Sequence, residues 1–477
     1  MTGVVAAEQP PADPGSGLPQ PGRTVAVACV LTAMSLVVLD AGMANVALPS
    51  MASSLQAPPA TVVLVVTAYQ TALVMALLPC AALGEWLGYR RIFTAGVAIF
   101  TVASALCALA PSLPWLITAR FLQGLGGAAV MALGVALLRV SVREGRIGAA
   151  VGWNALTVAL SSAAAPALGA FILAGLGWPW LYWVNLPMGA LALACSRALP
   201  AAKGAGRPVD PLSVALNGLT FGSLVIGAEM APRQPHMAGL VLAIGVLSLL
   251  GLLRREMPKA APMVPLDLLR GKPFRTSVFA SVCCFAGQTT GLVALPFYLQ
   301  HELGQTLLTT GLYMTAWPLS VAAAALAAGR LADRAPTGWL CALGGICLAL
   351  GLAAMALVPL EGEPRLLVPF VMICGLGFGL FQTPNNRNMF LYAPVERSGA
   401  AGGMQGTARL TGQTAGAVLM TLLFAATTID AAPRFGLGIA AVRARLARGV
   451  SLLGLAPRRG STGWQGPSSR IYERFRG

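Results

Sequence analysis

The sequence predicts an all-α integral membrane protein: two pseudo-symmetric six-helix bundles with two inserted helices between them. The chain has 477 residues, of which 56% are apolar and only 10% are charged, against roughly 25% charged in an ordinary soluble domain. Apolar runs of about 20 residues, enough to cross a bilayer, recur from residue 25 to residue 427. This composition excludes a soluble enzyme and leaves no stretch for a sizeable water-soluble domain.

Thirteen runs are predicted as membrane spans. They must be helices, because the alternating pattern of barrel strands is absent and each backbone amide needs a partner inside its own segment. In chain order the runs cover residues 25–48, 60–83, 92–110, 115–138, 148–173, 179–199, 212–231, 237–253, 276–299, 308–328, 338–360, 365–385 and 400–427.

A fourteenth run, residues 435–455, is degraded. It carries Arg443, Arg445 and Arg448, and each central Arg costs about 2.5 to 3.5 kcal/mol on insertion. The segment is therefore either a damaged fourteenth span or a basic amphipathic helix on the membrane surface.

The basic residues orient the spans. With a cytoplasmic N-terminus, nineteen of the 32 Lys and Arg residues fall in cytoplasmic connections, and only Arg233, Arg365 and Arg434 fall in outer ones. This asymmetry follows the positive-inside rule. It explains the net charge of +16 better than nucleic-acid binding, which needs basic residues gathered on one solvated face. We expect a multi-pass protein of the cytoplasmic (inner) membrane, in contact with lipid and with no nucleic-acid partner.

An internal repeat indicates two related halves. Leu83-Gly84-Glu85 after the second span is echoed by Leu331-Ala332-Asp333 after the tenth, and each copy closes a helix pair on the predicted cytoplasmic side. The predicted organisation is a disordered tail over 1–24, an N-terminal six-helix bundle over 25–199, a linker with two inserted helices over 200–253, a cytoplasmic loop over 254–275, a C-terminal helix bundle over 276–456 and a basic tail over 457–477.

Four motifs give the chain a specific signature. Residues 39–49 read L-D-A-G-M-A-N-V-A-L-P, and residues 83–91 read L-G-E-W-L-G-Y-R-R. Residues 120–129 read R-F-L-Q-G-L-G-G-A-A, and residues 165–170 read A-P-A-L-G-A. Together they resemble the fourteen-helix drug:proton antiporter family of the major facilitator superfamily, over about residues 25–425. The resemblance implies a transporter with a gate at the second motif and an antiporter signature at the fourth.

Asp40 and Arg120 are the candidate proton-coupling residues. Asp40 is the carboxylate that lies clearly within an apolar span, where an unpaired charge is costly and tends to take up a proton. The alternative is a solvated or backbone-bonded Asp near the helix end at Pro49. Arg120 keeps its proton, so it either holds a buried hydrogen-bond network or snorkels to the outer surface; the resemblance implies proton coupling. Arg409 is a weaker candidate that could snorkel to the inner face.

Two further groups follow from the motifs. The candidate gating residues form a charge-relay latch on short cytoplasmic loops, or alternatively act only as solvated topology signals: Glu85, Gly88, Arg90, Arg91, Asp333 and Arg334. The candidate helix-packing residues permit close crossings and a bend: Gly124, Gly127, Pro166 and Gly169.

Polar side chains within the spans are the candidate substrate contacts, although each could equally serve helix packing: Asn45, Tyr69, Gln70, Gln123, Gln288, Thr289, Tyr298, Gln382 and Gln413. His236 and His301 have no second ligand at metal spacing, so no metal site is predicted. The nine cysteines lie inside apolar runs and are interpreted as packing residues. We expect no cofactor and no catalytic residue.

The sequence therefore predicts a proton-coupled efflux transporter, acting as a monomer on a hydrophobic or amphipathic small molecule. No G-x-x-x-x-G-K-[ST] motif is present, which excludes an ATPase within the chain and leaves a proton gradient as the energy source. Three alternatives stay open: a dedicated exporter of an endogenous metabolite, a symporter of such a metabolite, and a membrane receptor without transport.

Overall fold

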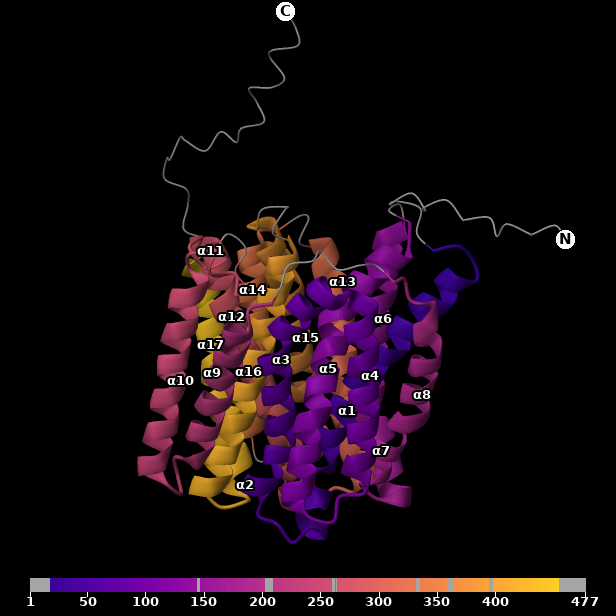
Figure 1. Cartoon of the computed structure of the whole chain (residues 1–477). Coiled ribbons are helices and arrows are strands. Elements are labelled where there is room, and N and C mark those ends of the chain that lie inside the picture. The colour runs from indigo at the N-terminus through magenta and orange to yellow at the C-terminus, as the bar shows by residue number, and fades with distance from the viewer. Residues whose placement is uncertain are drawn as a thin grey trace, which may run out of the picture.

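The chain folds into an elongated bundle of roughly parallel helices, seen in a computed structural model (Figure 1). The structure describes residues 18–143, 146–201, 209–259, 262, 264–331, 335–358, 364–393 and 398–453. Within these ranges it contains helices and turns and no strand, as the composition predicts. The predicted tails lie mostly outside the described residues.

The N-terminal half is built mainly from long apolar helices. Its elements are α1 (Gly22–Ser54), α2 (Pro59–Val62), α3 (Leu64–Leu87), α4 (Tyr89–Ala108), α5 (Leu113–Ser141), α6 (Ile147–Leu176), α7 (Trp180–Trp183), α8 (Asn185–Cys195) and the 3-10 turn η2 (Ser196–Ala198). The run predicted as one span over 179–199 is interrupted between α7 and α8. Pro187 follows the interruption, and its missing N–H leaves the carbonyl of Trp183 without the usual helical donor.

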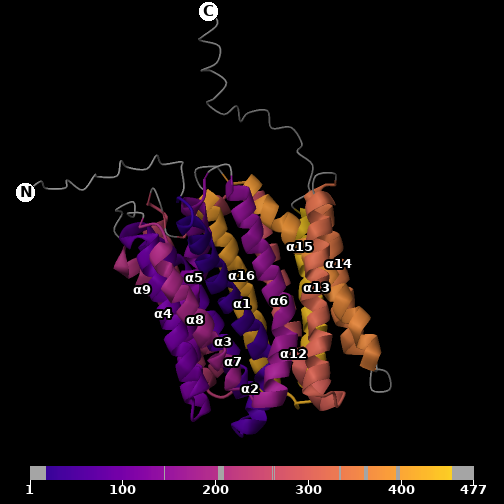
Figure 2. The same cartoon turned by 90° about the vertical axis from the view of Figure 1, so that its right-hand side faces the viewer.

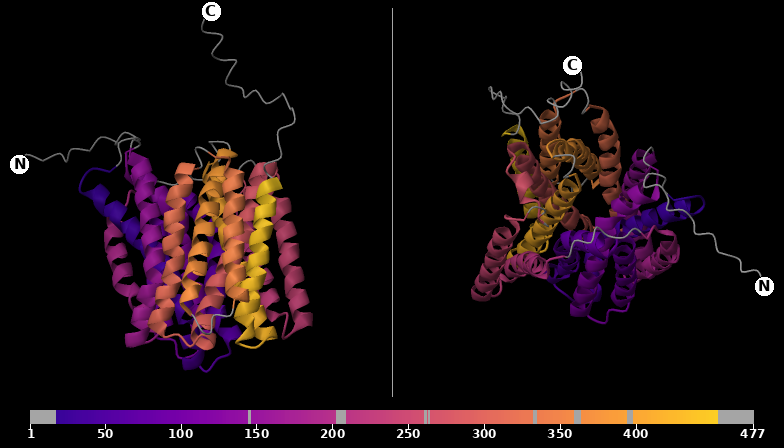
Figure 3. Two further views of the ribbon diagram at one scale, coloured as in Figure 1. Left: turned by 180° about the vertical axis from the view of Figure 1, so that it is seen from behind. Right: turned by 45° about the horizontal axis from the view of Figure 1, so that its top comes forward.

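The inserted pair and the C-terminal half follow. Their elements are α9 (Pro211–Met230), α10 (Pro235–Glu256), α11 (Leu266–Leu269), α12 (Lys272–Phe297), the π-helical turn η3 (Tyr298–Glu302), α13 (Leu307–Leu331), α14 (Thr337–Leu357), the 3-10 turn η4 (Pro364–Leu366), α15 (Leu367–Leu391), α16 (Ser398–Ala426) and α17 (Ala431–Leu453). We call the end where α1 begins and α17 ends the terminal end; it is at the top of Figures 1 and 3.

Eleven helical segments of the described chain are long and apolar enough to cross a membrane. The predicted counts of thirteen or fourteen spans are therefore not established by length and composition alone. The helices outside the eleven include α8, which is short, α16, which carries Arg409 within a Gly- and Thr-rich sequence, and α17.

The α17 helix packs as part of the C-terminal half. It packs against α12 and α14, and it stands beside them along their length in Figure 3. Small residues at helical spacing make this contact, from Ala432 through Ala440 and Ala444 to Ala447, all fully buried. A helix lying flat on a membrane surface would not bury one face over its length against two other helices, so the surface-helix alternative does not describe this structure.

The two halves meet along two seams. On one side α6 packs against α13, as Figure 2 shows, and on the other α3 packs against α16. The inserted helix α9 packs against both α3 and α16 and so covers the second seam. A side-chain hydrogen bond anchors it there: Asn217, fully buried, donates to the carbonyl oxygen of Met75 on α3 at 2.8 Å.

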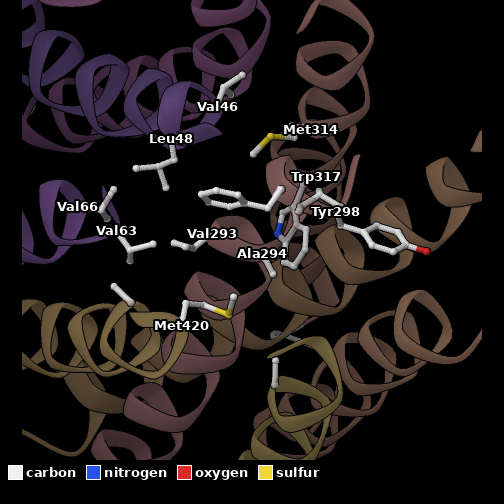
Figure 4. Close-up of a cluster of buried hydrophobic side chains, with 14 of the residues drawn as sticks. Val46, Leu48, Val63, Val66, Val293, Ala294, Tyr298, Met314, Trp317 and Met420 are labelled. Atoms are coloured by element: carbon white, nitrogen blue, oxygen red, sulfur yellow. The ribbon is translucent and has the colours of Figure 1, made fainter. Parts of the chain in front are cut away.

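The buried apolar side chains cluster differently at the two ends of the molecule. At the end opposite the termini, one continuous cluster contains side chains from both halves. In Figure 4, Leu48 and Val63 of the N-terminal half face Val293 and Met420 of the C-terminal half. Toward the terminal end, one cluster is centred on α1, α3, α4 and α5 and includes Leu410 of α16, and another lies on α11, α12, α15 and α16. The core shared by the two halves is thus most extensive at the end opposite the termini, and Leu410 of α16 adds a smaller contact nearer the terminal end.

A close helix approach supports the shared core. A Cβ atom placed at Gly311 of α13 would lie 2.8 Å from the carbonyl oxygen of Pro166 on α6, so only glycine fits there without displacing backbone. Pro166 and Ala170 of the fourth motif provide the opposing small surface. This contact brings the two halves together near the start of α13.

A cluster of charges closes the inserted pair at the terminal end. The carboxylate of Asp210 caps the start of α9 and accepts hydrogen bonds from Arg255 Nε and Lys259 Nζ, both at 2.7 Å. The fully buried Glu256 accepts from Ser213 and from Lys259. Hydrogen bonds from Arg255 and Lys259 hold the pKa of Asp210 far below its usual range.

We expect Asp210→Asn to lower the melting temperature of the purified protein by about 1 to 2 °C at pH 7, because Asn keeps the capping oxygen of α9 but removes the charge. A group with a lowered folded-state pKa stabilises above its unfolded value of about 3.9 and loses this effect as the pH falls. The difference between variant and wild type should therefore shrink from pH 5 to pH 2. Asp430→Asn, at an exposed loop position, is the control. A pH-independent difference would contradict the assignment.

Candidate functional site

A fully buried ion pair lies inside the N-terminal half. The carboxylate of Asp40 on α1 contacts the guanidinium of Arg120 on α5, with 2.5 Å between Oδ2 and Nη1. Each side chain is 1% exposed. The other carboxylate oxygen, Oδ1, accepts from Nδ2 of Asn185 at 2.7 Å and from Nε2 of Gln123 at 3.0 Å. Asp40 thus accepts hydrogen bonds from α5 and α8 through both oxygens.

The guanidinium of Arg120 makes hydrogen bonds and contacts two aromatic rings. Its Nε donates to the carbonyl oxygen of Val65 on α3 at 3.3 Å, and its Nη1 also donates to Oε1 of Gln123 at 2.5 Å. The guanidinium lies 4.2 Å from the ring centroid of Tyr69 and 5.6 Å from that of Tyr182. A cation between two aromatic rings is stabilised by their negative faces. The guanidinium is therefore paired, hydrogen-bonded and covered by rings.

Ser104 of α4 completes the network. Its hydroxyl accepts from Nε2 of Gln123 at 2.8 Å and from Nδ2 of Asn185 at 3.4 Å, and it donates to the carbonyl oxygen of Phe100. The network thus joins α1, α3, α4, α5 and α8, which are far apart in sequence. Such a network resists relative movement of these helices, because a broken bond would leave a buried polar group without a partner.

Glycines on α5 allow this assembly. A Cβ atom at Gly124 would lie 2.8 Å from the Cβ of Ala72 on α3, and one at Gly127 would lie 3.1 Å from the hydroxyl of Tyr69. Gly169 of α6 similarly lies close to α1, where an added Cβ would be 3.1 Å from the Cα of Met43. The predicted helix-packing residues, with Pro166 opposite Gly311, are therefore all at close helix crossings.

The geometry distinguishes the alternatives for the two charged residues. Asp40 is neither solvated nor bonded only to backbone, and it is not unpaired; its partner is 80 positions later in the chain, so the local sequence gives no sign of it. Arg120 does not snorkel to a surface. It holds a buried network, which is one of the two predicted alternatives.

The predicted gating residues lie at the terminal end. Gly88 has φ of +101° between α3 and α4, a conformation that side-chain-bearing residues rarely adopt. Glu85 and Arg91 are exposed and Arg90 is half-buried, and no ion pair joins them within the described residues. Asp333 and Arg334 lie outside the described residues. The latch therefore stays a prediction.

The predicted substrate contacts lie in both halves of the molecule and differ in their burial. Gln123 and Tyr69 belong to the buried network. Asn45 and Gln70 are half-buried, each with a side-chain oxygen that is buried without a hydrogen-bond partner, and such oxygens are free to accept from a ligand or from water. Thr289 and Tyr298 are buried within the C-terminal half, while three glutamines there are half-buried: Gln288, Gln382 and Gln413.

Sequence reasoning missed three polar residues in this region. Asn185 and Ser104 complete the Asp40 network; the lone Asn in an apolar run was the available signal. Glu229, near the end of α9, has an Oε1 that is buried without a hydrogen-bond partner. Among the described residues, no group of three or more His, Cys, Asp or Glu side chains could hold a metal ion.

Two packed helical halves, many membrane-length helices and a charged network buried in one half define a polytopic helical protein. A model described as Major Facilitator Superfamily matches residues 30–417. The chain belongs to this superfamily, whose members are transporters, and relatives with drug-efflux names support its place in the drug:proton antiporter family.

Individual relatives are consistent with this assignment. The chain is 41% identical to the "Uncharacterized transporter YebQ" of Escherichia coli, over 85% of this chain and 90% of that protein. It is 28% identical to the "Riboflavin transporter RibZ" of Clostridioides difficile (84% and 87% covered) and 28% identical to the "Tetracenomycin C resistance and export protein" of Streptomyces glaucescens (88% and 79%). A crystal structure of a mutant peptide transporter POT with sulfate has the same fold, with a TM-score of 0.67 at 17% identity, covering 90% of this chain and 93% of that one.

We expect Arg120→Leu to destabilise the protein by about 3 to 5 kcal/mol, because it leaves the Asp40 carboxylate buried without its cation. The double variant Asp40→Asn/Arg120→Leu should recover part of this loss, since no charge then remains unpaired. Denaturant unfolding in detergent measures both, with Arg365→Leu at an exposed position as the control. If Arg120→Leu unfolds within 1 kcal/mol of wild type, the pair is not the constraint described here.

Proposed function

We propose that this chain is a proton-coupled efflux transporter that exports a hydrophobic or amphipathic small molecule, such as a drug or antibiotic, across the cytoplasmic membrane by alternating access. The observation that carries the proposal is the carboxylate of Asp40, buried within the membrane helices and joined to Arg120, because ionisable residues at such positions mark proton relays and substrate pathways. The relative named for tetracenomycin C resistance and export supports export.

The orientation follows from the basic residues. Under the positive-inside rule the terminal end faces the cytoplasm, and the core shared by both halves then closes the outer side. Toward the cytoplasm, Leu410 of α16 is the buried residue of the C-terminal half that joins the core of the N-terminal half. The conformation is inward-facing, which is the state that receives a substrate for export.

Proton uptake by Asp40 is the proposed coupling step. A proton on the carboxylate removes the charge that holds Arg120, and it weakens the hydrogen bonds from Gln123 and Asn185. The network joins α1 to α5 and α8, so its weakening lowers the cost of moving these helices relative to one another. Release of the proton to the cytoplasm restores the pair. Alternation between the two arrangements exposes the binding region to each side in turn.

The proton gradient supplies enough energy. One proton returns about 1.4 kcal/mol per pH unit and about 2.3 kcal/mol per 100 mV. A gradient of one pH unit and 100 mV therefore supports roughly a 500-fold excess of a neutral substrate outside. One titrating carboxylate per cycle is sufficient.

Finer features of the organisation are part of the proposal. We infer fourteen spans, with α7 and α8 together, α16 and α17 added to the eleven that meet the length and composition criterion. The protein acts as a monomer, with α9 and α10 as the inserted pair. In the outward-facing state, Glu85, Gly88, Arg90 and Arg91, with Asp333 and Arg334 of the second copy, form the latch of the cytoplasmic gate.

A dedicated carrier of one endogenous metabolite is the second candidate. The relative named as a riboflavin transporter favours it, and such a carrier could be an exporter or a symporter. Substrate accumulation in inverted vesicles identifies export, and uptake into right-side-out vesicles identifies symport. A receptor without transport would give no accumulation with any compound tested.

We expect Asp40→Asn to abolish proton-driven accumulation in inverted vesicles while the protein remains inserted, because the variant side chain cannot take up a proton. The measurement is uptake from a panel of drugs and metabolites with and without a protonophore. Asp430→Asn removes a carboxylate at an exposed position and should leave uptake unchanged. Full gradient-dependent uptake by Asp40→Asn would refute the coupling role.

We expect Gly311→Leu to open the outer seal, because the larger side chain cannot fit against Pro166 without separating α13 from α6. Met314 is 1% exposed, and Met314→Cys provides a thiol at this position. A membrane-impermeant maleimide applied from outside should label this thiol about tenfold faster in the Gly311→Leu background than in the native background. The labelling of the native cysteines is subtracted. Gly239→Leu on α10, where an added Cβ meets nothing within 4 Å, is the matched control. Equal labelling rates in both backgrounds would show that this contact does not close the outer side.

A further inference from the structure

Arg409 is a second arginine deep in the helix bundle, on the α16 side of the seam between the halves. It is the twelfth residue of α16, roughly 17 Å from the start of that helix at 1.5 Å per residue. Its Nη2 lies 3.9 Å from Sδ of Met131 on α5, and Met131 is at a similar depth from the terminal end of its own helix. The side chain therefore extends across the seam and does not snorkel to the inner face.

Arg409 differs from Arg120 in having no anion beside it. The Arg409 side chain is half-buried; its Nε is buried and has no hydrogen-bond partner, and within the described part of the chain no carboxylate forms an ion pair with it. Burying a guanidinium without a counter-charge is costly, and Arg can donate hydrogen bonds but cannot accept them. The group that would satisfy it must therefore be an acceptor, and a negative charge would satisfy it best.

The Tyr69 hydroxyl offers a second donor at the same place. Tyr69 is 2% exposed and its hydroxyl has no hydrogen-bond partner. A Cβ at Gly127, one helical turn before Met131 on α5, would lie 3.1 Å from this hydroxyl, and Met131 contacts Arg409. The ring of Tyr69 covers Arg120. Gln413 lies one helical turn after Arg409 on the same side of α16 and is half-buried.

Apolar side chains surround these donors. Met131 lies beside the guanidinium, Leu410 packs into the core of the opposite half, and a Cβ at Gly406 would lie 2.9 Å from Leu77 of α3. A ligand at this position would therefore contact apolar side chains over most of its surface and hydrogen-bond donors without partners at one point. This combination suits a compound with an apolar body and one anionic oxygen group.

We propose that Arg409 and the Tyr69 hydroxyl bind the carboxylate of an amphipathic organic anion, and that such anions are the substrate class of this transporter. The inference rests on the proposed transport function and narrows its substrate. It also agrees with the energetics, because the inside-negative potential assists the outward movement of an anion by about 2.3 kcal/mol per 100 mV. Tyr69 also covers Arg120, the partner of Asp40. The proposed ligand site and the proposed proton site therefore share Tyr69.

Equilibrium binding of two matched fluorescent probes tests the proposal. The full-length protein in nanodiscs of neutral lipid is titrated with 1-pyrenebutyrate and with 1-pyrenebutanol, which differ in the anionic group. We expect the wild type to bind the carboxylate at least tenfold more tightly than the alcohol. Arg409→Gln should abolish this preference, and Tyr69→Phe should reduce it two- to fivefold. Arg443→Gln, which changes a partly buried arginine of α17, should preserve it.

Each outcome is decisive. A wild type with no preference for the carboxylate, or a preference that survives in Arg409→Gln, overturns the proposal. If Arg409→Gln does not fold, Tyr69→Phe and Arg409→Lys decide in its place: an unchanged preference in Tyr69→Phe, or a lost one in Arg409→Lys, contradicts the site. The assay uses no gradient, so its result does not depend on proton coupling. The two proposals can fail separately. If proton-driven uptake depends on Asp40 but the protein shows no preference for the carboxylate probe, the proposed function is supported and only the inference about the substrate class is wrong.

Discussion

The ion pair between Asp40 and Arg120 is the interaction on which the N-terminal half depends. Two opposite charges removed from water are tolerable only when they remain together and their other polar atoms are satisfied. This condition fixes the positions of Gln123, Asn185 and Ser104, and with them the packing of five helices. A change of charge at one carboxylate oxygen therefore affects the whole half rather than one side chain, which is the property that a coupled transporter requires.

Small residues decide how the halves meet. Helices in a membrane gain little from the hydrophobic effect between them, so close approach at Gly, Ala and Ser positions supplies much of the contact energy. Gly311 against Pro166 joins the halves near the end opposite the termini, and Gly124 against Ala72 joins two helices within one half. In the proposed alternating access, the first kind of contact opens, whereas the second holds the network together and persists.

The C-terminal half carries its arginines in a different way. Arg120 is neutralised by a residue of the protein, but Arg409 extends across the seam with a buried nitrogen that has no partner. In α17, alanines face α12 and α14, while Arg445 lies on the exposed side of the helix. An average hydropathy over this helix hides that division, which explains why a segment with three arginines still packs as part of the bundle.

The sequence by itself determined the all-helical class with membrane-length helices and the family, because bilayer-length apolar runs and short motifs are local properties of the chain. It also identified Asp40 and Arg120 individually. Only the tertiary structure decided that these two residues pair, that Asn185 and Ser104 complete their network, that the shared core closes one end, and that Arg409 faces the seam without an anion. These features depend on contacts between residues tens to hundreds of positions apart, and helical periodicity does not encode which helix a polar side chain will face.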